Sequence, residues 1–315
     1  MKIAFFWTPQ FAADILSWLL KYPEIDIVLA VSQPDKMVGR KYKLTATPVK
    51  CVALENGIEV LQPESLRGQS LENDLKSRNL DYIVVVAYGK IIPKSILDTP
   101  KYGCINLHGS ILPAYRGASP VQAALKDWVS ETGLTTMYMS EWMDEWDILQ
   151  IAKIKVDTDD KTPDIFQKFV DIGPKLLRST LTWVINWEIS WIPQNHNEAT
   201  YCGKISKEDG KISFQRQSAQ EIYNLFRAYT PWPGIFCSYK GKRLVIEIVH
   251  LLQDTSILNS FPSQGKEASI VASSPLAGEN WERYWVKKGQ LIKISKNRYG
   301  IVCSDFKILE LSQVK

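Results

Sequence analysis

An amide and an imidazole are placed for acyl-transfer chemistry at one point of this chain. The run Cys104-Ile105-Asn106-Leu107-His108 predicts a short strand. Residues two apart in a strand point to the same face, so Asn106 and His108 would lie side by side. An amide N–H can stabilise an oxyanion, and an imidazole can give or take up a proton. A buried polar pair without catalysis is the alternative interpretation.

The residues after this strand predict a ligand-binding edge. Gly109 begins a turn, and residues 111–113 form a short apolar ledge whose proline has a fixed φ. Ser119 and Pro120 then begin a helix as its N-cap and first helical residue. Open α/β sheets bind their ligands at the carboxyl ends of strands, which is where this segment is expected.

The whole segment from Cys104 to Gln122 closely resembles the signature of the 10-formyltetrahydrofolate-dependent formyltransferases. That signature reads Asn-x-His-x-Ser-Leu-Leu-Pro and is followed by Arg-Gly, and Ile111 is a leucine-to-isoleucine change in its core. The resemblance implies that a formyl group passes from 10-formyltetrahydrofolate, the co-substrate, to an amine. It also implies that Asn106 holds the oxyanion and that His108 donates to it or moves a proton.

The same resemblance implies where the folate binds. The folate is expected to lie against the apolar ledge and the end of a second strand, held largely by backbone groups. The residues expected at this folate site are Ser110, Ile111, Leu112, Pro113, Val86 and Ala87. No metal is required, and the histidines, His108, His196 and His250, form no metal-ligand cluster in the sequence.

A second segment, residues 132–149, resembles the family's other catalytic segment, in which Thr-Gly is followed by Met-Asp-x-Gly-Leu-Asp-Thr-Gly-Asp. Asp144 falls on the catalytic aspartate of that pattern. The resemblance implies that Asp144 orients His108 and favours its charged form. Ser140 and Glu145 depart from the pattern, because they replace an aspartate and a threonine.

Three tryptophans, Trp7, Trp142 and Trp146, stand where the family has glycine. Glycine is used where φ is positive or where a backbone must approach a ligand closely. Two interpretations stay open. Either the rings are real and pack on the pterin, which predicts slow turnover, or the gene belongs to an organism that decodes UGA as glycine. Trp128 and Trp187 are further candidates for the second interpretation.

Two features of the sequence favour tRNA as the formyl acceptor. The basic loop over residues 32–44 resembles the loop with which tRNA formyltransferases touch the acceptor stem. The expected contacts are Arg40, Lys41 and Lys43. Residues 229–234 resemble the Pro-Trp-Pro segment in the second domain of those enzymes, in which Trp232 is expected to be a true tryptophan. The resemblance implies formyl transfer to the α-amino group of methionyl initiator tRNA in bacterial-type translation initiation.

Three other functions remain open at this point. The chain could be a formyltransferase for glycinamide ribonucleotide or for an amino sugar, but the basic loop and the second domain weigh against both. It could also be a catalytically impaired tRNA-binding homologue, which the tryptophans near Asp144 suggest. Formyl transfer to charged initiator tRNA separates these alternatives.

The elements that must position these side chains alternate between strand and helix. Strands are expected near residues 3–7, 25–31, 59–61, 82–87 and 104–108. The fourth of them is continuously apolar, as expected of a strand buried on both faces. This rhythm predicts an α/β fold with a doubly wound, mostly parallel, Rossmann-like sheet. No GxGxxG follows the first strand, so a nicotinamide or flavin cofactor is not indicated.

The later part of the chain has a different pattern. Two helices are expected near residues 164–172 and 174–186, separated at Gly173-Pro174. A capping box at residues 218–221 predicts a further helix, and the short strands after it predict a small OB-like β-barrel. We expect a formyltransferase catalytic domain over residues 1–188, a linker over residues 189–207 and a C-terminal tRNA-binding barrel over residues 208–315.

Composition limits the class of protein. An apolar content of 45% and a charged content of 23% are typical of a globular protein, and the five cysteines contain no CxxC pair. The apolar run at the start is too short for a signal peptide, and no membrane-length run follows. Together with the cysteine pattern this favours the cytoplasm. We also expect a monomer. Residues 201–315 hold 17 Lys and Arg against 10 Asp and Glu, a balance of +7 within a total of +4, which favours a polyanionic partner for this half.

Overall fold

The structure is a computed structural model that describes residues 1–38, 42–188, 190–239, 241–251, 269–270, 284–285, 288, 291–295, 298–305 and 308–314. These residues form two compact units. The first unit consists of Met1–Ala124, Val129–Thr158 and Asp164–Lys204, and the second of Leu125–Trp128, Asp159–Pro163 and Ile205–Lys315. The expected domain boundaries, by contrast, were three continuous ranges.

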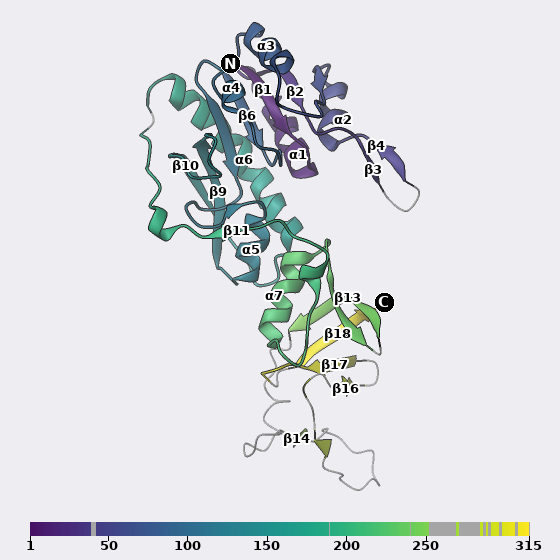
Figure 1. Ribbon diagram of the computed structural model, residues 1–315. Coiled ribbons are helices and arrows are strands. Elements are labelled where there is room, and N and C mark those ends of the chain that lie inside the picture. Colours follow the sequence, from purple (N-terminus) through teal and green to yellow (C-terminus); the bar gives the residue numbers. More distant parts are fainter. Residues whose placement is uncertain are drawn as a thin grey trace. The chain divides into compact units, whose positions relative to one another are not determined.

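The first unit is built on one seven-stranded sheet (Figure 1). Its strands, in spatial order, are β10 (Ile148–Lys155), β9 (Glu131–Tyr138), β7 (Cys104–His108), β6 (Tyr82–Val86), β1 (Lys2–Trp7), β2 (Asp26–Val31) and β5 (Val60–Leu61). The five strands from β7 to β5 pair in parallel. β9 pairs antiparallel with both of its neighbours, β7 and β10. The predicted α/β class with a mostly parallel sheet is confirmed.

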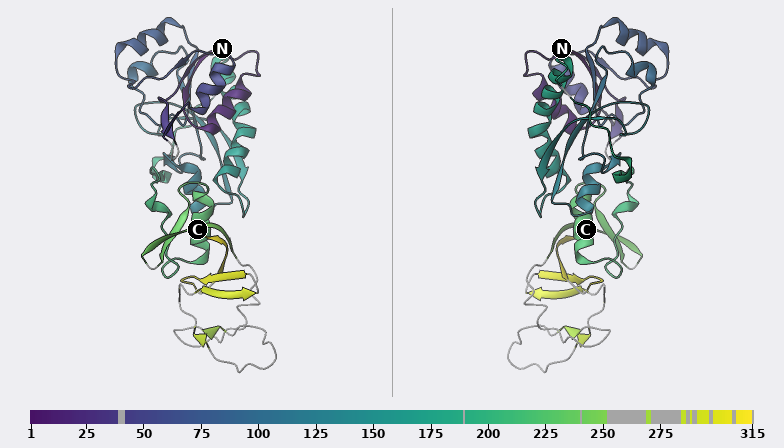
Figure 2. Two further views of the ribbon diagram at one scale, coloured as in Figure 1. Left: turned by 90° about the vertical axis from the view of Figure 1, so that its right-hand side faces the viewer. Right: turned by 90° about the vertical axis from the view of Figure 1, so that its left-hand side faces the viewer.

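Helices cover both faces of this sheet (Figure 2). They are α1 (Gln10–Leu19), α2 (Pro48–Glu55), α3 (Gln69–Ser77), α4 (Lys94–Leu97), α5 (Pro120–Lys126) and α6 (Thr162–Ile185). On one face, Ala4 and Phe6 of β1 pack with Leu75 of α3 and Ile96 of α4. On the other face, the Tyr82 hydroxyl donates to the Leu181 carbonyl of α6. The central strands β1 and β6 are therefore buried on both faces, apart from Lys2 at the start of β1.

The expectation of two helices separated at Gly173-Pro174 is wrong, because α6 is continuous and contains Pro174. The Gly-Pro pair has a packing role instead. A Cβ on Gly173 would lie 2.8 Å from Ile15 Cδ1 and 3.2 Å from Leu134 Cδ1. The absent side chain lets α6 approach α1 and β9 closely, and the helix continues through the proline.

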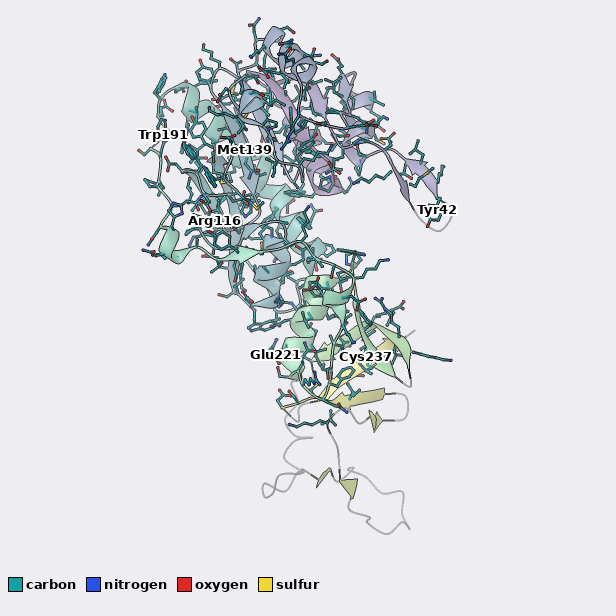
Figure 3. The ribbon with its side chains drawn as sticks, in the orientation of Figure 1. Tyr42, Arg116, Met139, Trp191, Glu221 and Cys237 are labelled. Carbon is teal, nitrogen blue, oxygen red and sulfur yellow. The ribbon has the colours of Figure 1, made fainter. Side chains whose placement is uncertain are left out.

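A short hairpin occupies most of the predicted basic loop. It pairs β3 (Lys36–Val38) with β4 (Lys43–Thr45) and extends away from the sheet, with Tyr42 near its tip (Figure 3). Asp35, at its base, accepts hydrogen bonds from Lys50 and Gln62, at 2.7 Å each. These bonds, of which the one from Lys50 is the main cause, hold the pKa of Asp35 below its ordinary value.

In its described residues, the second unit contains the helix α7 (Ala219–Tyr229) and an antiparallel five-stranded sheet that curls as a half-barrel. The sheet order is β12 (Ile235–Tyr239), β13 (Lys242–Leu251), β18 (Ile308–Val314), β17 (Arg298–Val302) and β16 (Leu291–Ser295). A separate pair is β14 (Ser269–Ile270) with β15 (Tyr284–Trp285). The helix α7 begins with the predicted capping box, in which Ser218 and Glu221 each accept from the other's backbone N–H.

Two short segments from earlier in the chain belong to this second unit. The Asn224 amide donates to the Lys126 carbonyl at 3.1 Å, and Arg227 Nε donates to the Asp160 carbonyl at 2.8 Å. Thr162 Oγ1 donates to the Ala228 carbonyl at 2.6 Å. Residues 125–128 and 159–163 are thus held to α7 by hydrogen bonds.

Candidate active site

The carboxyl end of β7 presents Asn106 and His108 on one face. Asn106 is paired with Val85 of β6 on one side, and His108 with Thr135 of β9 on the other. Asn106 is 9% exposed and His108 is 5% exposed. Both polar side chains are therefore nearly buried, and each needs partners inside the protein or on a ligand.

The Asp144 carboxylate lies beside both of these side chains. Its Oδ2 is 3.7 Å from His108 Nδ1 and accepts from the Gly117 backbone N–H at 2.8 Å. Its Oδ1 accepts from Asn106 Nδ2 at 3.4 Å. Asp144 itself has φ +55°. The structure thus brings together the three residues that the two sequence motifs predicted, from segments 36 residues apart.

This geometry can support transfer through a tetrahedral intermediate. An imidazole N–H can donate to an oxyanion, and the imidazole ring can also carry a proton between two groups. His108 Nε2 lies 3.0 Å from the Tyr115 carbonyl oxygen, to which it donates in the tautomer that carries its proton on Nε2. Asn106 brings an amide N–H₂ to the same place. An imidazole, an amide and a carboxylate therefore lie together at the carboxyl end of β7.

The apolar ledge after β7 is fixed from behind by Thr135. Thr135 Oγ1 donates to the Ser110 carbonyl at 2.6 Å and accepts from the Leu112 N–H at 3.2 Å. Ser110 Oγ donates to the Ala114 carbonyl at 2.6 Å, and the Leu112–Pro113 peptide is cis. Leu112 and Ser110 are buried, whereas Ile111 and Pro113 are half-buried. Within the ledge, Ile111 and Pro113 are therefore more exposed than Leu112.

The end of β6 and the end of β1 lie at the same edge of the sheet. Val86, the last residue of β6, is buried and paired with Trp7, and Ala87 after it has φ +51°. Two hydroxyls near this edge, Thr8 Oγ1 and Tyr88 OH, are buried and have no hydrogen-bond partner among the described residues. Burial also raises the pKa of Tyr88 to about 12, which keeps its hydroxyl a neutral donor. Unpaired buried polar atoms of this kind suit a polar ligand.

A buried guanidinium, which the sequence analysis left without a role, supports the Asp144 loop. Arg116, fully buried, donates from Nε and Nη2 to Gln194 Oε1 at 3.0 and 2.7 Å (Figure 3). Gln194 Nε2 in turn donates to the carbonyls of Asp144 and Trp146, at 2.9 and 2.6 Å. Gln194 lies in a segment without helical or strand periodicity, so no pattern in the sequence indicated it.

Two short strands complete this support. β8 (Arg116–Gly117) pairs in parallel with β11 (Tyr201–Cys202). Cys202 Sγ donates to the carbonyls of Tyr115 and Arg116, and burial raises the pKa of this thiol. Gly117, at φ +116°, has no room for a Cβ, which would collide with the Cys202 carbonyl oxygen. The backbone N–H that binds Asp144 is thereby held in place.

The residues expected to contact tRNA are only partly described. Lys43 is exposed at the start of β4. Arg40 and Lys41 lie outside the described residues. Within the described part of the chain, no group of three or more His, Cys, Asp or Glu side chains could hold a metal ion. No helix among those residues is long and apolar enough to cross a membrane.

Comparison with known families identifies the class of protein. The family described as formyl transferase matches residues 1–181, and the formyl transferase C-terminal domain matches residues 204–315. The chain therefore belongs to the formyl transferase family, as the motifs predicted, and it is an enzyme of that family.

Proteins similar to this chain are named methionyl-tRNA formyltransferases. A methionyl-tRNA formyltransferase of Caldicellulosiruptor saccharolyticus is 46% identical over 260 residues, which cover 82% of this chain and 83% of the relative. A methionyl-tRNA formyltransferase of Lachnospira eligens is 37% identical over 303 residues, covering 96% and 88%.

Solved structures agree on the fold. The sugar 3N-formyl transferase WlaRD, solved in the presence of dTDP and 5-N-formyl-THF, has a TM-score of 0.63 at 17% identity, covering 99% of this chain and 97% of its own. HypX from Aquifex aeolicus in complex with tetrahydrofolic acid has a TM-score of 0.61 at 13% identity, covering 100% of this chain and 44% of its own. At these identities the likeness extends to the fold alone.

Proposed function

We propose that this formyltransferase moves a formyl group from 10-formyltetrahydrofolate to the α-amino group of methionyl initiator tRNA. The observation that carries the proposal is the identity of 37–46% with relatives named methionyl-tRNA formyltransferase over 82–96% of the chain. The domain pattern supports it, because both family domains match and together span most of the chain.

In this proposal Asn106, His108 and Asp144 form the reaction centre. The amine nitrogen attacks the formyl carbon, and the resulting oxyanion accepts from the Asn106 amide and from a His108 N–H. The carbon–nitrogen bond to the folate then breaks, the amine loses one proton and the folate nitrogen gains one. His108, 3.7 Å from the Asp144 carboxylate, can carry this proton.

The folate is proposed to occupy the edge formed by the ends of β6 and β7. The buried hydroxyls of Thr8 and Tyr88 without partners support this location, since a folate ring offers acceptors to such donors. The ledge residues Ile111 and Pro113 offer apolar contact to a flat ring. The proposed folate residues remain Ser110, Ile111, Leu112, Pro113, Val86 and Ala87.

The tRNA is proposed to contact the β3–β4 hairpin and the basic second unit. Lys43 is exposed on that hairpin, and residues 201–315 carry a balance of +7. Positive charge of this kind attracts phosphates from a distance and speeds association. Arg40 and Lys41 remain proposed contacts, and the protein is proposed to act as a monomer in the cytoplasm.

One experiment tests the function. The purified protein is given 10-formyltetrahydrofolate and, in separate reactions, methionylated initiator tRNA, glycinamide ribonucleotide and a dTDP-linked amino sugar. We expect formyl transfer to the charged tRNA alone. Equal or faster transfer to either small acceptor, or binding of the tRNA without transfer, would overturn the proposal in favour of one of the three alternatives.

A further inference from the structure

The left-handed helix ends of this protein carry two unusual residues. Helices commonly end with a residue at positive φ, usually glycine and sometimes asparagine, whose N–H and that of the next residue bond back into the last turn. α2 ends in this way at Gly57, with φ +70°, and α3 ends at Asn79, with φ +52°. α5 and α6 end at Trp128 and Trp187, each with φ +58°.

The hydrogen bonds at these two tryptophans repeat the pattern at the glycine. Gly57 N–H donates to the Leu54 carbonyl, and the next residue, Ile58, donates to the carbonyl five residues back, at 3.1 and 2.8 Å. The pair at Trp187 and Glu188 donates to the equivalent carbonyls at 3.3 and 2.9 Å, and the pair at Trp128 and Val129 at 3.2 and 3.3 Å. The backbone therefore takes the same shape at all three ends.

Tryptophan is poorly suited to that shape. In the left-handed region the Cβ crowds the following carbonyl oxygen, and a bulky residue there is an outlier. Trp187 is also 82% exposed, so burial of its ring does not compensate the strain. At Trp128 the Arg227 guanidinium lies 4.6 Å from the ring centroid, a contact that favours the ring at that position. Backbone strain without such a contact is therefore better tested at Trp187.

A third tryptophan is strained by packing. Trp7 is fully buried, and its ring centroid is only 3.5 Å from that of Phe5, whereas aromatic pairs prefer separations of 4.5–7 Å. Its indole N–H is buried and finds no acceptor among the described residues. A buried tryptophan normally has a partner for this group. The tryptophan ring at position 7 therefore has too little room, and its indole N–H has no acceptor among the described residues.

We propose that positions 7, 128 and 187 carry glycine in the protein as its own cell makes it, because the codons behind these tryptophans are UGA decoded as glycine. UGA differs from the glycine codon GGA by one base. A glycine at 128 and 187 removes the strain at both helix ends. A glycine at 7 empties the end of β1 beside Val86, which opens the proposed folate edge, and that consequence alone rests on the proposed function.

Peptide masses of the protein purified from its source cells test the proposal directly. We expect glycine at positions 7, 128 and 187, and tryptophan at positions 183 and 232. Tryptophan found at position 128 or 187 overturns the proposal. Since a peptide mass is independent of activity, this result does not depend on which formyl acceptor the enzyme uses.

Stability gives a second test, on the chain as its sequence is written. Trp187→Gly is expected to raise the thermal midpoint by roughly 2–4 °C, because it relieves left-handed strain. The control is Trp183→Gly, in the last turns of α6 and also exposed, at 44% against 82% for Trp187. This change should lower the midpoint, because glycine weakens a helix interior. Gly57→Trp should also lower it. A Trp187→Gly variant no more stable than the parent overturns the proposal.

A separate observation carries a second proposal, about Gln194. This side chain is 7% exposed. Among the described residues, it alone joins the Arg116 guanidinium to the Asp144 carbonyl by hydrogen bonds to both. We infer that Gln194 is a positioning residue: it holds the loop that carries the Asp144 carboxylate against His108. The inference rests on the proposed catalytic role of Asp144.

Substitutions at Gln194 test this role. Gln194→Ala should lower kcat by tenfold or more with KM within about twofold, since small displacements at a reaction centre are costly. Gln194→Glu keeps an acceptor for Arg116 and loses both donors, so it should also fail to restore kcat. The matched control, Gln150→Ala, removes a half-buried acceptor of Ser179 and Thr180 and should change the thermal midpoint without this loss of kcat.

The outcomes separate the two ideas. A Gln194→Ala variant with full kcat, when Asp144→Ala is inactive, overturns the positioning role and leaves the proposed function standing. An active Asp144→Ala variant overturns the catalytic role of Asp144 itself. A kcat loss that merely follows the loss of folded protein, measured in parallel by thermal unfolding, also overturns the positioning role.

Discussion

At the scale of single residues, the proposed reaction centre is a cluster of three polar side chains. Asn106 and His108 were predictable because a strand places alternate residues on one face. Asp144 was predictable only through the family motif, because no periodicity links it to β7. Arg116 belongs to the Arg-Gly of the family signature, but its contact with Gln194, which fixes the loop of Asp144, gave no readable signal. A contact between loops depends on the folded chain and leaves no local pattern.

Removing either of the two β7 side chains is expected to stop most turnover. Asn106→Ala and His108→Ala should each lower kcat by about 10²-fold or more, since oxyanion stabilisation and acid–base transfer each contribute on that order. Steady-state formylation assays measure the effect. Asn56→Ala and His250→Ala are matched controls at exposed positions. The assigned roles are contradicted if either active-site variant keeps more than about a tenth of the parent kcat, because acid–base transfer alone contributes on the order of 10²-fold.

Gly117 is expected to be intolerant of any side chain. Gly117→Ala would place a Cβ against the Cys202 carbonyl oxygen at φ +116°, which costs about 1–3 kcal/mol in strain. It would also shift the N–H that binds Asp144. Gly203→Ala is the matched control, because nothing lies within 4 Å of its Cβ position. Chemical denaturation compares the two, and equal unfolding free energies would contradict this account.

At the scale of elements, propensity gave the strands and most helices, and packing decided the exceptions. The Gly173-Pro174 pair reads as a helix stop in sequence, yet α6 continues through it because the missing Cβ lets the helix pack onto α1. The basic loop contains a hairpin whose strands are only three residues long, too short for a periodic signal. Packing between distant elements thus explains the first difference, and the shortness of the strands explains the second.

The β3–β4 hairpin is expected to contribute a phosphate contact. Lys43→Ala and Arg40→Ala should each raise KM for charged tRNA, with the larger defect at low salt. Each lost contact should also reduce the salt dependence of the affinity by about one counterion. Formylation measured over a series of salt concentrations gives the slope. Lys94→Ala, exposed on α4, is the control, and an unchanged slope in both hairpin variants argues against tRNA contact there.

At the scale of the whole molecule, the sequence indicated two regions of different character, an α/β region and a region of short strands. The fold classes of both are confirmed. What no sequence pattern conveyed is that residues 125–128 and 159–163 belong to the second unit. Such short pieces have too few residues for a periodic pattern, and only their hydrogen bonds to α7 identify them.

The reactivity of two buried cysteines can measure the unfolding of each unit separately. Cys104 in the first unit and Cys303 in the second are buried, and Cys51 is exposed. Burial raises the pKa of Cys303 to about 12 and also raises that of Cys104, so neither thiol reacts readily in the folded state. We expect a thiol reagent to modify Cys51 first.

Denaturant then distinguishes the units. If they unfold independently, Cys104 and Cys303 should become reactive at different denaturant concentrations, measured by peptide mass after pulse labelling. Cys51→Ser removes the background reaction and serves as the control. Immediate modification of Cys303 in native buffer contradicts the buried position described for it.

The interleaving of the two units also limits how genes of this family can recombine. A crossover at residue 205 exchanges the half-barrel between two parents but leaves Leu125–Trp128 and Asp159–Pro163 with the original one. The new α7 would then face carbonyl groups presented by a foreign backbone. Chimaeras should therefore fold well only when these two short stretches are inherited together with the C-terminal region.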